Sequence, residues 1–342
     1  MRRSTRFGLV ILTALLVVGG GYTAFWFLVA RRIEAGVVDW ALSQRADKID
    51  LSWQKMRVSG YPAAFRVDLG SAALRDGAIT PSPELHIPVL SGTARPWDFA
   101  DWRLAAPDGF TADFAAAGRG APAKLIAQTA EGVVSIEPKG GWTLWLTLGG
   151  TTVEAAAPVL VGSAHATLTV LPRPSRGHAD PVMALAVEAS QIKLPLGVGP
   201  LGDLIDELDF GATVKGAMPS GKLADAVAVW RDAGGTIELD NLHLKWGALN
   251  ATATGTIALD QELQPTGGFS GAFQGYDQIL TALVQNGQMR ASDAGLARIA
   301  LTFLAKAGPE GKPEIRTAFK IQNGQMFLGP AKLGRVPRIT WE

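Results

Sequence analysis

Residues 7–30 form an unbroken run of 24 uncharged, mostly apolar residues, and this run constrains the chain more than any other feature. Arginines flank it on both sides: Arg2, Arg3 and Arg6 before the run, Arg31 and Arg32 after it. A helix needs about 20 such residues to cross a hydrocarbon core of about 30 Å, so the run is long enough to span a membrane. The rest of the chain is then held beside a bilayer.

Three interpretations of the run are open. A secretory signal peptide has an apolar stretch of about 7–15 residues and a small-x-small cleavage site. Residues 19–21 are glycines and imitate such a site, but the chain stays apolar beyond them, and Leu28 is too large for the −3 position of a cut after Ala30. Tyr22 and Trp26 suit an aromatic belt at a membrane interface. We favour an uncleaved anchor over a cleaved signal, and place a buried helix third.

The charges around the run do not decide its orientation, because basic residues lie on both sides and acidic residues hardly count. The absence of cysteine fits an extracytoplasmic bacterial domain and a cytoplasmic one equally well. A long C-terminal domain can be translocated whatever its flanking charge. We expect a single-pass protein of the inner (cytoplasmic) membrane, with the amino terminus in the cytoplasm and the bulk of the chain in the periplasm.

The composition indicates a folded chain without a nucleic-acid surface. Hydrophobic residues make up 47% of the sequence and charged residues 18%, so the chain can bury a sizeable core. A formal net charge of +1 with scattered Lys and Arg gives no electrostatic footprint for nucleic acid.

Period-two alternation dominates the middle of the chain. Alternating segments predict strands at residues 65–69, 85–89, 142–148, 164–170, 183–187 and 249–259. Helical spacing of apolar residues predicts helices at residues 223–230, 279–284 and 296–304. The predicted fold is mainly β, an antiparallel, meandering, curved and extended sheet with several helices in the C-terminal half. With the N-terminal transmembrane helix, the class is α+β.

Four regions follow from this pattern. Residues 1–30 are a cytoplasmic stub and the transmembrane anchor, and residues 31–48 an amphipathic stalk helix with Ile33, Val37, Trp40 and Ala41 on one stripe. Residues 49–199 form a β-meander region. Residues 200–342 combine sheet with interleaved helices and are continuous with the preceding region.

Two local signals fix strand register. Asn323-Gly324 is the preferred two-residue hairpin turn and would pair Ile321 with Met326. The same turn would pair Phe319 with Leu328. A shift of parity across Asp240 and Asn241 predicts a β-bulge.

The sequence predicts no catalytic residue, no cofactor and no metal site. The histidines lack a metal-binding or catalytic motif, and those at 86, 165 and 243 fall on the polar face of alternating strands. Residues 197–202 match G-x-G-x-x-G, but the surroundings lack the βαβ unit that dinucleotide binding needs. We interpret this stretch as a glycine-rich connection, with Asp203, Asp206 and Glu207 after it on a solvated helix face.

Several Gly, Pro and Trp landmarks resemble a known family. They are Trp53, residues 58–62, Phe65, residues 96–97, Trp102, residues 242–247, residues 255–260, residues 323–324, residues 328–330 and residues 333–337. Together they resemble bacterial domain-of-unknown-function family 2125, single-anchor envelope proteins, over nearly the whole chain. The resemblance implies no known activity. The Gly-x-Leu-x-Leu-Asp type of strand end is also distantly similar to AsmA-like proteins, which are associated with lipid handling, an analogy of fold only.

An apolar sheet face must be covered by helices, by a second sheet or by a hydrophobic ligand. The tryptophans at 97, 102, 142, 145, 230, 246 and 341 could therefore line a groove or fill a core, and core packing is the more common role. The candidate groove-lining residues are Trp142, Leu144, Leu146, Leu168, Trp246, Phe269 and Phe273.

Two functions remain, and an enzyme is a distant third. The first is a membrane-anchored module that holds or passes lipid or another hydrophobic ligand. The second is a structural or assembly factor of the envelope that binds a protein partner and no small ligand.

Overall fold

The computed structural model describes residues 2–77, 82–114, 122–155, 157–172, 177–197, 201–217, 219, 223–308, 311–328, 331–336, 338–339 and 341. Its most prominent element is helix α1 (Arg2–Gln44), which joins the predicted anchor and the predicted stalk into one continuous helix. At 1.5 Å per residue, 43 residues give a helix of about 65 Å. A short 3-10 helix, η1 (Arg45–Asp47), ends it.

The first half of the chain after α1 is all strand. Its strands are β1 (Ile49–Ser52), β2 (Lys55–Ser59), β3 (Phe65–Asp76), β4 (Glu84–Arg95), β5 (Asp98–Ala106), β6 (Phe110–Phe114), β7 (Ala123–Ala127), β8 (Thr129–Ile136), β9 (Trp142–Glu154), β10 (Val159–Val170) and β11 (Pro181–Lys193). The strands predicted at residues 65–69, 85–89, 142–148, 164–170 and 183–187 lie within these elements, and the strand predicted at 249–259 coincides with β14 (Leu249–Leu259) in the second half.

The second half adds helices between the strands. Its elements are β12 (Leu204–Lys215), α2 (Leu223–Asp232), β13 (Thr236–Trp246), β14 (Leu249–Leu259), β15 (Pro265–Gln274), α3 (Tyr276–Gln285), α4 (Ala291–Leu304), β16 (Lys306–Ala307), β17 (Pro313–Gln322), β18 (Gln325–Leu328) and β19 (Ala331–Arg335). The three predicted helices are confirmed, but the acidic residues Asp206 and Glu207 lie in strand β12. The prediction of a helix there was wrong: residues 207–210 alternate between acidic and apolar, a period of two that is typical of a strand.

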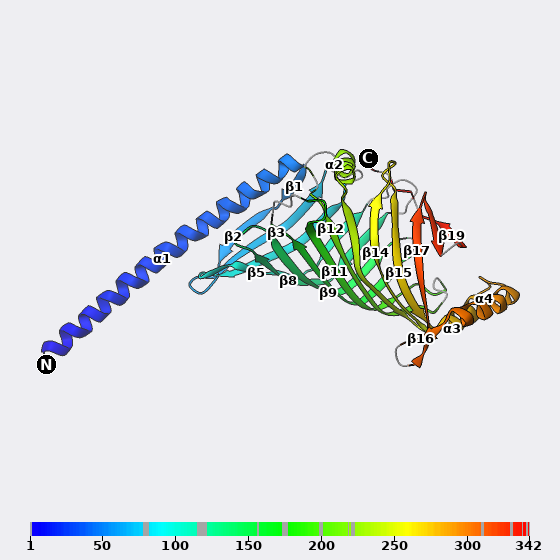
Figure 1. The fold of residues 1–342 in the computed structure, drawn as a ribbon. Helices are drawn as coiled ribbons and strands as arrows, with labels where there is room; N and C mark the ends of the chain where they lie inside the picture. Colours follow the sequence, from blue (N-terminus) through cyan, green and yellow to red (C-terminus); the bar gives the residue numbers. More distant parts are fainter. Residues whose placement is uncertain are drawn as a thin grey trace.

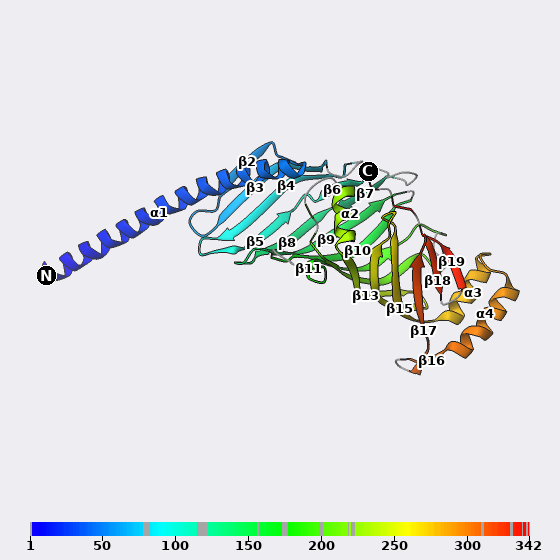
Figure 2. The same cartoon turned by 45° about the horizontal axis from the view of Figure 1, so that its top comes forward.

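All the described strands belong to one antiparallel sheet, in which most strands pair with the strand before or after them along the chain, while β5 pairs with β8 and β7 with β9. Strands β1 and β2 pair in turn with β3, and β5 and β6 pair in turn with β4, so each couple acts as one interrupted strand. From β9 to β15 the sheet is an uninterrupted meander. Figures 1 and 2 show that this sheet curls along its length into a trough, with α1 at one end and α3 and α4 at the other.

The two predicted register signals are confirmed. The Asn323-Gly324 turn pairs Ile321 with Met326, and Phe319 with Leu328. Asn323 and Gly324 both have positive φ, as a primed hairpin turn requires. A register shift in the pairing of β13 marks the bulge at Asp240 and Asn241.

The tightest packing lies where α1 meets the sheet. Trp26 and Ala30 of α1 are buried against Phe65, which is 0% exposed. In contrast, Leu15, Leu16 and the neighbouring apolar residues of α1 are exposed. Within the described chain, α1 is the one helix long and apolar enough to cross a membrane, and its apolar segment is hardly buried by protein. The interpretation of the run as a buried helix was therefore wrong.

Candidate functional site

A row of uncharged side chains crosses the sheet from one strand to the next. Directly opposite residues in antiparallel strands point to the same face of a sheet, so successive pairings trace one row. The central row runs through thirteen strands, from β2 to β17. Its members are Val58, Val67, Gly92, Leu104, Gly132, Leu146, Ala166, Val187, Phe210, Leu242, Ala253, Gly271 and Thr317.

Parallel rows, two or four residues away along most strands, are equally apolar. One consists of Leu144, Leu168, Leu185, Ala212, Leu239, Gly255, Phe269 and Phe319. Another consists of Leu148, Ala164, Ala189, Leu208, Leu244, Ala251, Phe273 and Ile315. A third consists of Trp142, Val170, Met183, Val214, Ile237, Ile257, Gly267 and Ile321. We call the side of the sheet that carries these rows the apolar face.

The structure places all seven predicted groove-lining residues on this face. Trp142, Leu144 and Leu146 come from β9, and Leu168 lies opposite Leu144 on β10. Phe269 and Phe273 come from β15, and Trp246 follows Leu244 on the same side of β13. The sequence missed most of the other row members, because alternation shows which residues of one strand share a face but not which strands lie opposite one another.

The apolar face is only partly buried. Between β9 and β15, no member of the four rows falls in the buried class, and Met183 is 37% exposed. A sheet face that packs against a second layer carries fully buried side chains instead. The packed cover that a closed core would need is therefore missing from this part of the described chain.

Glycines in the rows make room for large neighbours. A Cβ atom added to Gly255 would lie 2.4 Å from Cδ1 of Phe269, the residue opposite it on β15. A Cβ atom on Gly92 would lie 3.5 Å from the rings of Trp102 and from Leu104. These aromatic rings therefore lie against the glycine backbone of the neighbouring strand.

The opposite face is polar. The row next to the central one contains Thr147, His165, Glu188, Asp209, His243 and Thr252. His243 Nδ1 lies 3.2 Å from Asp209 Oδ2 and its Nε2 lies 3.0 Å from Asn250 Oδ1. His165 and His243 thus fall on the polar side, as the alternation predicts. Among the described residues no group of three or more His, Asp or Glu is placed to hold a metal ion.

Not all the tryptophans share the apolar face. Trp145 points away from it, since it alternates with Leu144 and Leu146, and it is 48% exposed. Trp230 belongs to α2 and is buried, and its indole N–H donates to the carbonyl of Lys215 at 2.8 Å. The indole of Trp341 donates to the carbonyl of Leu263, and Trp97 lies in an exposed turn. The tryptophans are therefore not, as a group, residues that line the apolar face.

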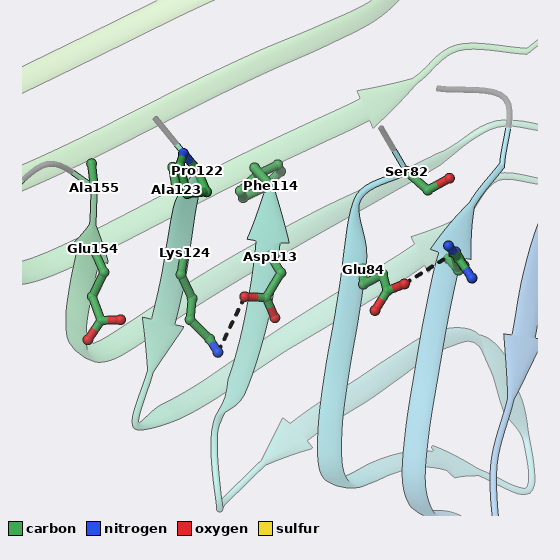
Figure 3. A pocket seen from close by; sticks show the side chains of 10 residues that line it. Ser82, Glu84, Asp113, Phe114, Pro122, Ala123, Lys124, Glu154 and Ala155 are labelled. Carbon is green, nitrogen blue, oxygen red and sulfur yellow. Dashed lines mark ion pairs between the residues drawn. The ribbon is translucent and has the colours of Figure 1, made fainter. Parts of the chain in front are cut away.

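Charged residues lie opposite one another at one margin of the sheet, on strands β3, β4, β6 and β7. Arg75 pairs with Glu84 at 3.2 Å, and Lys124 with Asp113 at 3.3 Å, around a depression of ≈ 590 Å³ (Figure 3). These pairs are largely exposed, and such pairs contribute only about 0–1 kcal/mol. The depression is open and carries these ion pairs beside Phe114 and Pro122, so it differs in kind from the uncharged apolar face.

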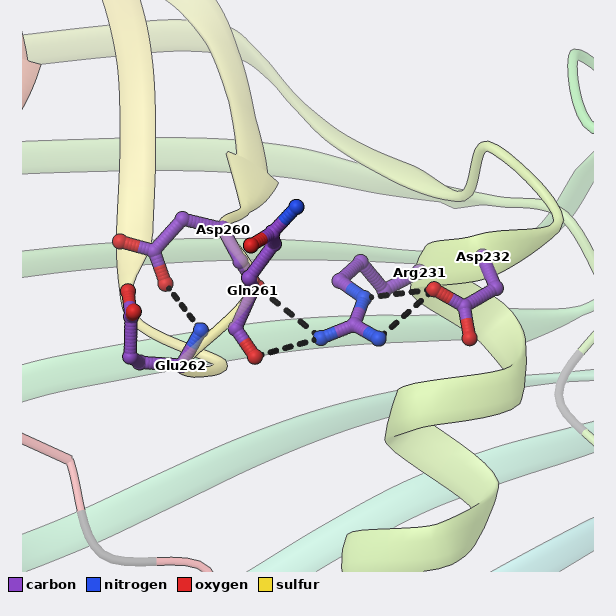
Figure 4. Close-up of polar contacts among 5 residues, drawn as sticks. All are labelled: Arg231, Asp232, Asp260, Gln261 and Glu262. Carbon is purple, nitrogen blue, oxygen red and sulfur yellow. Dashed lines mark hydrogen bonds and ion pairs between the residues drawn. The ribbon is translucent and has the colours of Figure 1, made fainter.

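An arginine joins helix α2 to a turn at the margin of the sheet. Arg231 donates from Nη1 to the carbonyls of Asp260 and Gln261 in the β14–β15 turn, at 3.1 and 2.9 Å (Figure 4). The carboxylate of Asp260 in turn accepts from the backbone N–H of Glu262 at 3.0 Å and closes the turn. The short helix and the hairpin therefore form one unit.

The fold and this face define an α+β protein built on one long, curled antiparallel sheet with a one-sided apolar surface and an apolar N-terminal helix. The chain belongs to the family described as uncharacterized protein conserved in bacteria (DUF2125), whose model matches residues 26–337. No curated protein and no solved structure matches the chain. The resemblance seen in the Gly, Pro and Trp landmarks is thereby confirmed.

Proposed function

We propose that this protein is a single-pass protein of the inner membrane that holds or passes lipid, or another hydrophobic ligand, along the apolar face of its sheet. The observation that carries the proposal is the central row, which is uncharged through thirteen strands and lacks a packed cover from β9 to β15. Exposing such a surface to water is unfavourable by about 25 cal/mol for each Å². Extended exposed apolar surfaces mark ligand or membrane contacts.

The length of the row suits acyl chains. Thirteen strands at about 4.8 Å spacing give a path of about 58 Å along the sheet, against about 30 Å for the hydrocarbon core of a bilayer. An acyl chain reaches across about half of that core. The face therefore offers room for more than one chain laid across the strands.

The anchor supports this assignment. Trp26 stacks on Phe65 of the sheet, so α1 belongs to the folded unit. A signal-type cut after Ala30 would remove Trp26 and uncover Phe65, which favours the uncleaved anchor. We place the sheet in the periplasm, where a long C-terminal domain can be translocated whatever its flanking charges.

A matched pair of variants tests the proposal in the full-length protein. Leu146 lies on the apolar face and its neighbour Thr147 on the polar face, so Leu146→Glu and Thr147→Glu add the same charge to opposite sides of β9. The measurement is the phospholipid retained for each protein molecule after exchange into lipid-free detergent, by mass spectrometry. We expect loss of lipid for Leu146→Glu and retention for Thr147→Glu.

The proposal is contradicted if both variants retain as much lipid as the unmodified protein. Circular dichroism of each variant separates loss of ligand from loss of fold.

A protein partner is the second candidate, and helix α4 favours it. Its stripe of Leu296, Ile299, Phe303 and Leu304 is exposed, with Phe303 at 86%. An envelope assembly factor could present this stripe to another protein. Lipid-free protein with an intact fold would favour this function.

A further inference from the structure

The β2–β3 turn, which touches α1, and the β4–β5 turn carry exposed aromatic side chains. Tyr61 lies in the β2–β3 turn, Trp97 in the β4–β5 turn and Phe99 at the start of β5, and Trp97 is 74% exposed. Phe25 and Phe27 of α1 are also exposed. We call these five residues the aromatic collar.

The β2–β3 turn is fastened to α1 by specific contacts. Thr23 Oγ1 lies 2.7 Å from the hydroxyl of Tyr61, and the indole of Trp26 donates to the carbonyl of Ala64 at 3.1 Å. Phe27 stacks on Tyr61, with ring centroids 6.1 Å apart. The β2–β3 turn therefore has a fixed position along the helix axis.

That position coincides with the end of a membrane span. A hydrocarbon core of about 30 Å takes up about 20 helical residues, and counted from Phe7 these end at Trp26. The turn contacts α1 at Thr23 and Trp26, within the last turn of that segment. Tyr and Trp side chains are favoured at this depth, and Arg31 and Arg32 follow where lipid phosphates would lie.

We propose that the aromatic collar sits in the interface of the bilayer that α1 crosses, so that the apolar face begins beside the lipid acyl chains. Val58 and Val67, the first members of the central row, lie on the two strands that this turn joins. Val58 packs against the Trp26–Phe65 cluster and Val67 is buried, so α1 covers the row at its very start. The collar is thus proposed to contact the lipid surface. This inference rests on the proposed membrane span of α1. Lipid would enter the apolar face from this end.

Single-cysteine labelling tests the depth of the collar, because the chain contains no cysteine. Nitroxide labels are placed by Ala63→Cys in the β2–β3 turn, Leu16→Cys in the span and Glu262→Cys in the distant β14–β15 turn. All three side chains are exposed. The full-length protein is reconstituted in phosphatidylethanolamine and phosphatidylglycerol vesicles, and collision with oxygen is compared with collision with a water-soluble nickel chelate.

We expect the label at residue 63 to be accessible to oxygen and shielded from the chelate, at a depth between those at 16 and 262. Adding Trp97→Ser and Tyr61→Ser should raise its accessibility to the chelate several-fold. The inference is overturned if residue 63 is as accessible to the chelate as residue 262 while residue 16 stays shielded. That result would leave the lipid-retention test at Leu146 unaffected, so the two claims fail separately.

Discussion

Trp26 of helix α1 stacks on Phe65 of strand β3, with ring centroids 5.0 Å apart and an angle of 11° between the ring planes. This contact joins the apolar helix to the apolar face of the sheet, because Phe65 alternates onto the same side as Val67 of the central row. The helix and the sheet are therefore one structural unit, and the position of one fixes the position of the other.

Removing the ring of Phe65 should weaken the packing of helix α1 against the sheet. Phe65 is fully buried, so Phe65→Ala leaves a cavity and should cost about 3–5 kcal/mol of unfolding free energy. Phe27→Ala is the matched control, because Phe27 is exposed and its loss should cost less than 1 kcal/mol. Urea unfolding in detergent measures both, and equal effects would contradict the described packing.

Gly255 should be intolerant of any side chain. A Cβ atom there would lie 2.4 Å from Phe269 and 2.5 Å from the carbonyl oxygen of Gly268, so Gly255→Ala should destabilise the sheet by about 1–3 kcal/mol. At Gly268, a Cβ atom would meet nothing within 4 Å, and Gly268→Ala should be neutral. The difference between the two urea midpoints tests the packing of the face.

The β17–β18 turn should depend on Gly324. Its φ of 65° favours glycine, and Gly324→Ala should cost about 1–2 kcal/mol of local stability. Gly334 on β19 has open space around it and no positive φ, so Gly334→Ala is the control. Hydrogen exchange of the β17 and β18 amides should accelerate in Gly324→Ala alone, and unchanged exchange there would contradict the primed turn.

Acid should weaken the sheet through Asp68. Burial alone would raise the pKa of this carboxyl, but hydrogen bonds from Ser91 and Arg66 and the positive charges of Arg66 and Arg57 hold the pKa below its usual value. The folded state then binds fewer protons than the unfolded one. The stabilisation is complete above the unfolded pKa of about 3.9 and is lost as the pH falls through the lower folded value.

Asp68→Asn removes that pH dependence. The variant should be less stable than the unmodified protein at pH 7, and the gap between them should narrow below about pH 4. Denaturant unfolding at several pH values measures this, and a gap that stays constant with pH would show that the charge of Asp68 plays no part.

The sequence predicted the parts of this fold that depend on local chemistry. Alternation identified the strands, and Asn323-Gly324 identified the last hairpin, since turn type and pairing follow from neighbouring residues. Asp206 and Glu207 were misplaced on a helix because a short acidic stretch fits both periods. The continuity of the central row was not predictable, because the pairing of Val187 with Phe210 depends on register between strands separated by a loop.

The seven candidate lining residues came from strands whose alternation was clear, and all of them share one face. Trp145 shows the limit of residue type as a guide, because it lies beside Leu144 and Leu146 but points to the polar side. What sequence could not supply was the absence of a packed cover over β9 to β15. That property depends on how the helices are distributed in space, and α3 and α4 lie at the end of the sheet (Figure 1).

The most direct measurement is photo-crosslinking in native membranes at two adjacent residues of β11. A benzophenone amino acid replaces Val187 of the central row in one variant and Glu188 of the polar face in the other. The account predicts lipid adducts, seen as phospholipid mass added to the protein, at residue 187 and none at residue 188. Adducts at neither residue, or equally at both, would contradict the claim that the apolar face holds lipid.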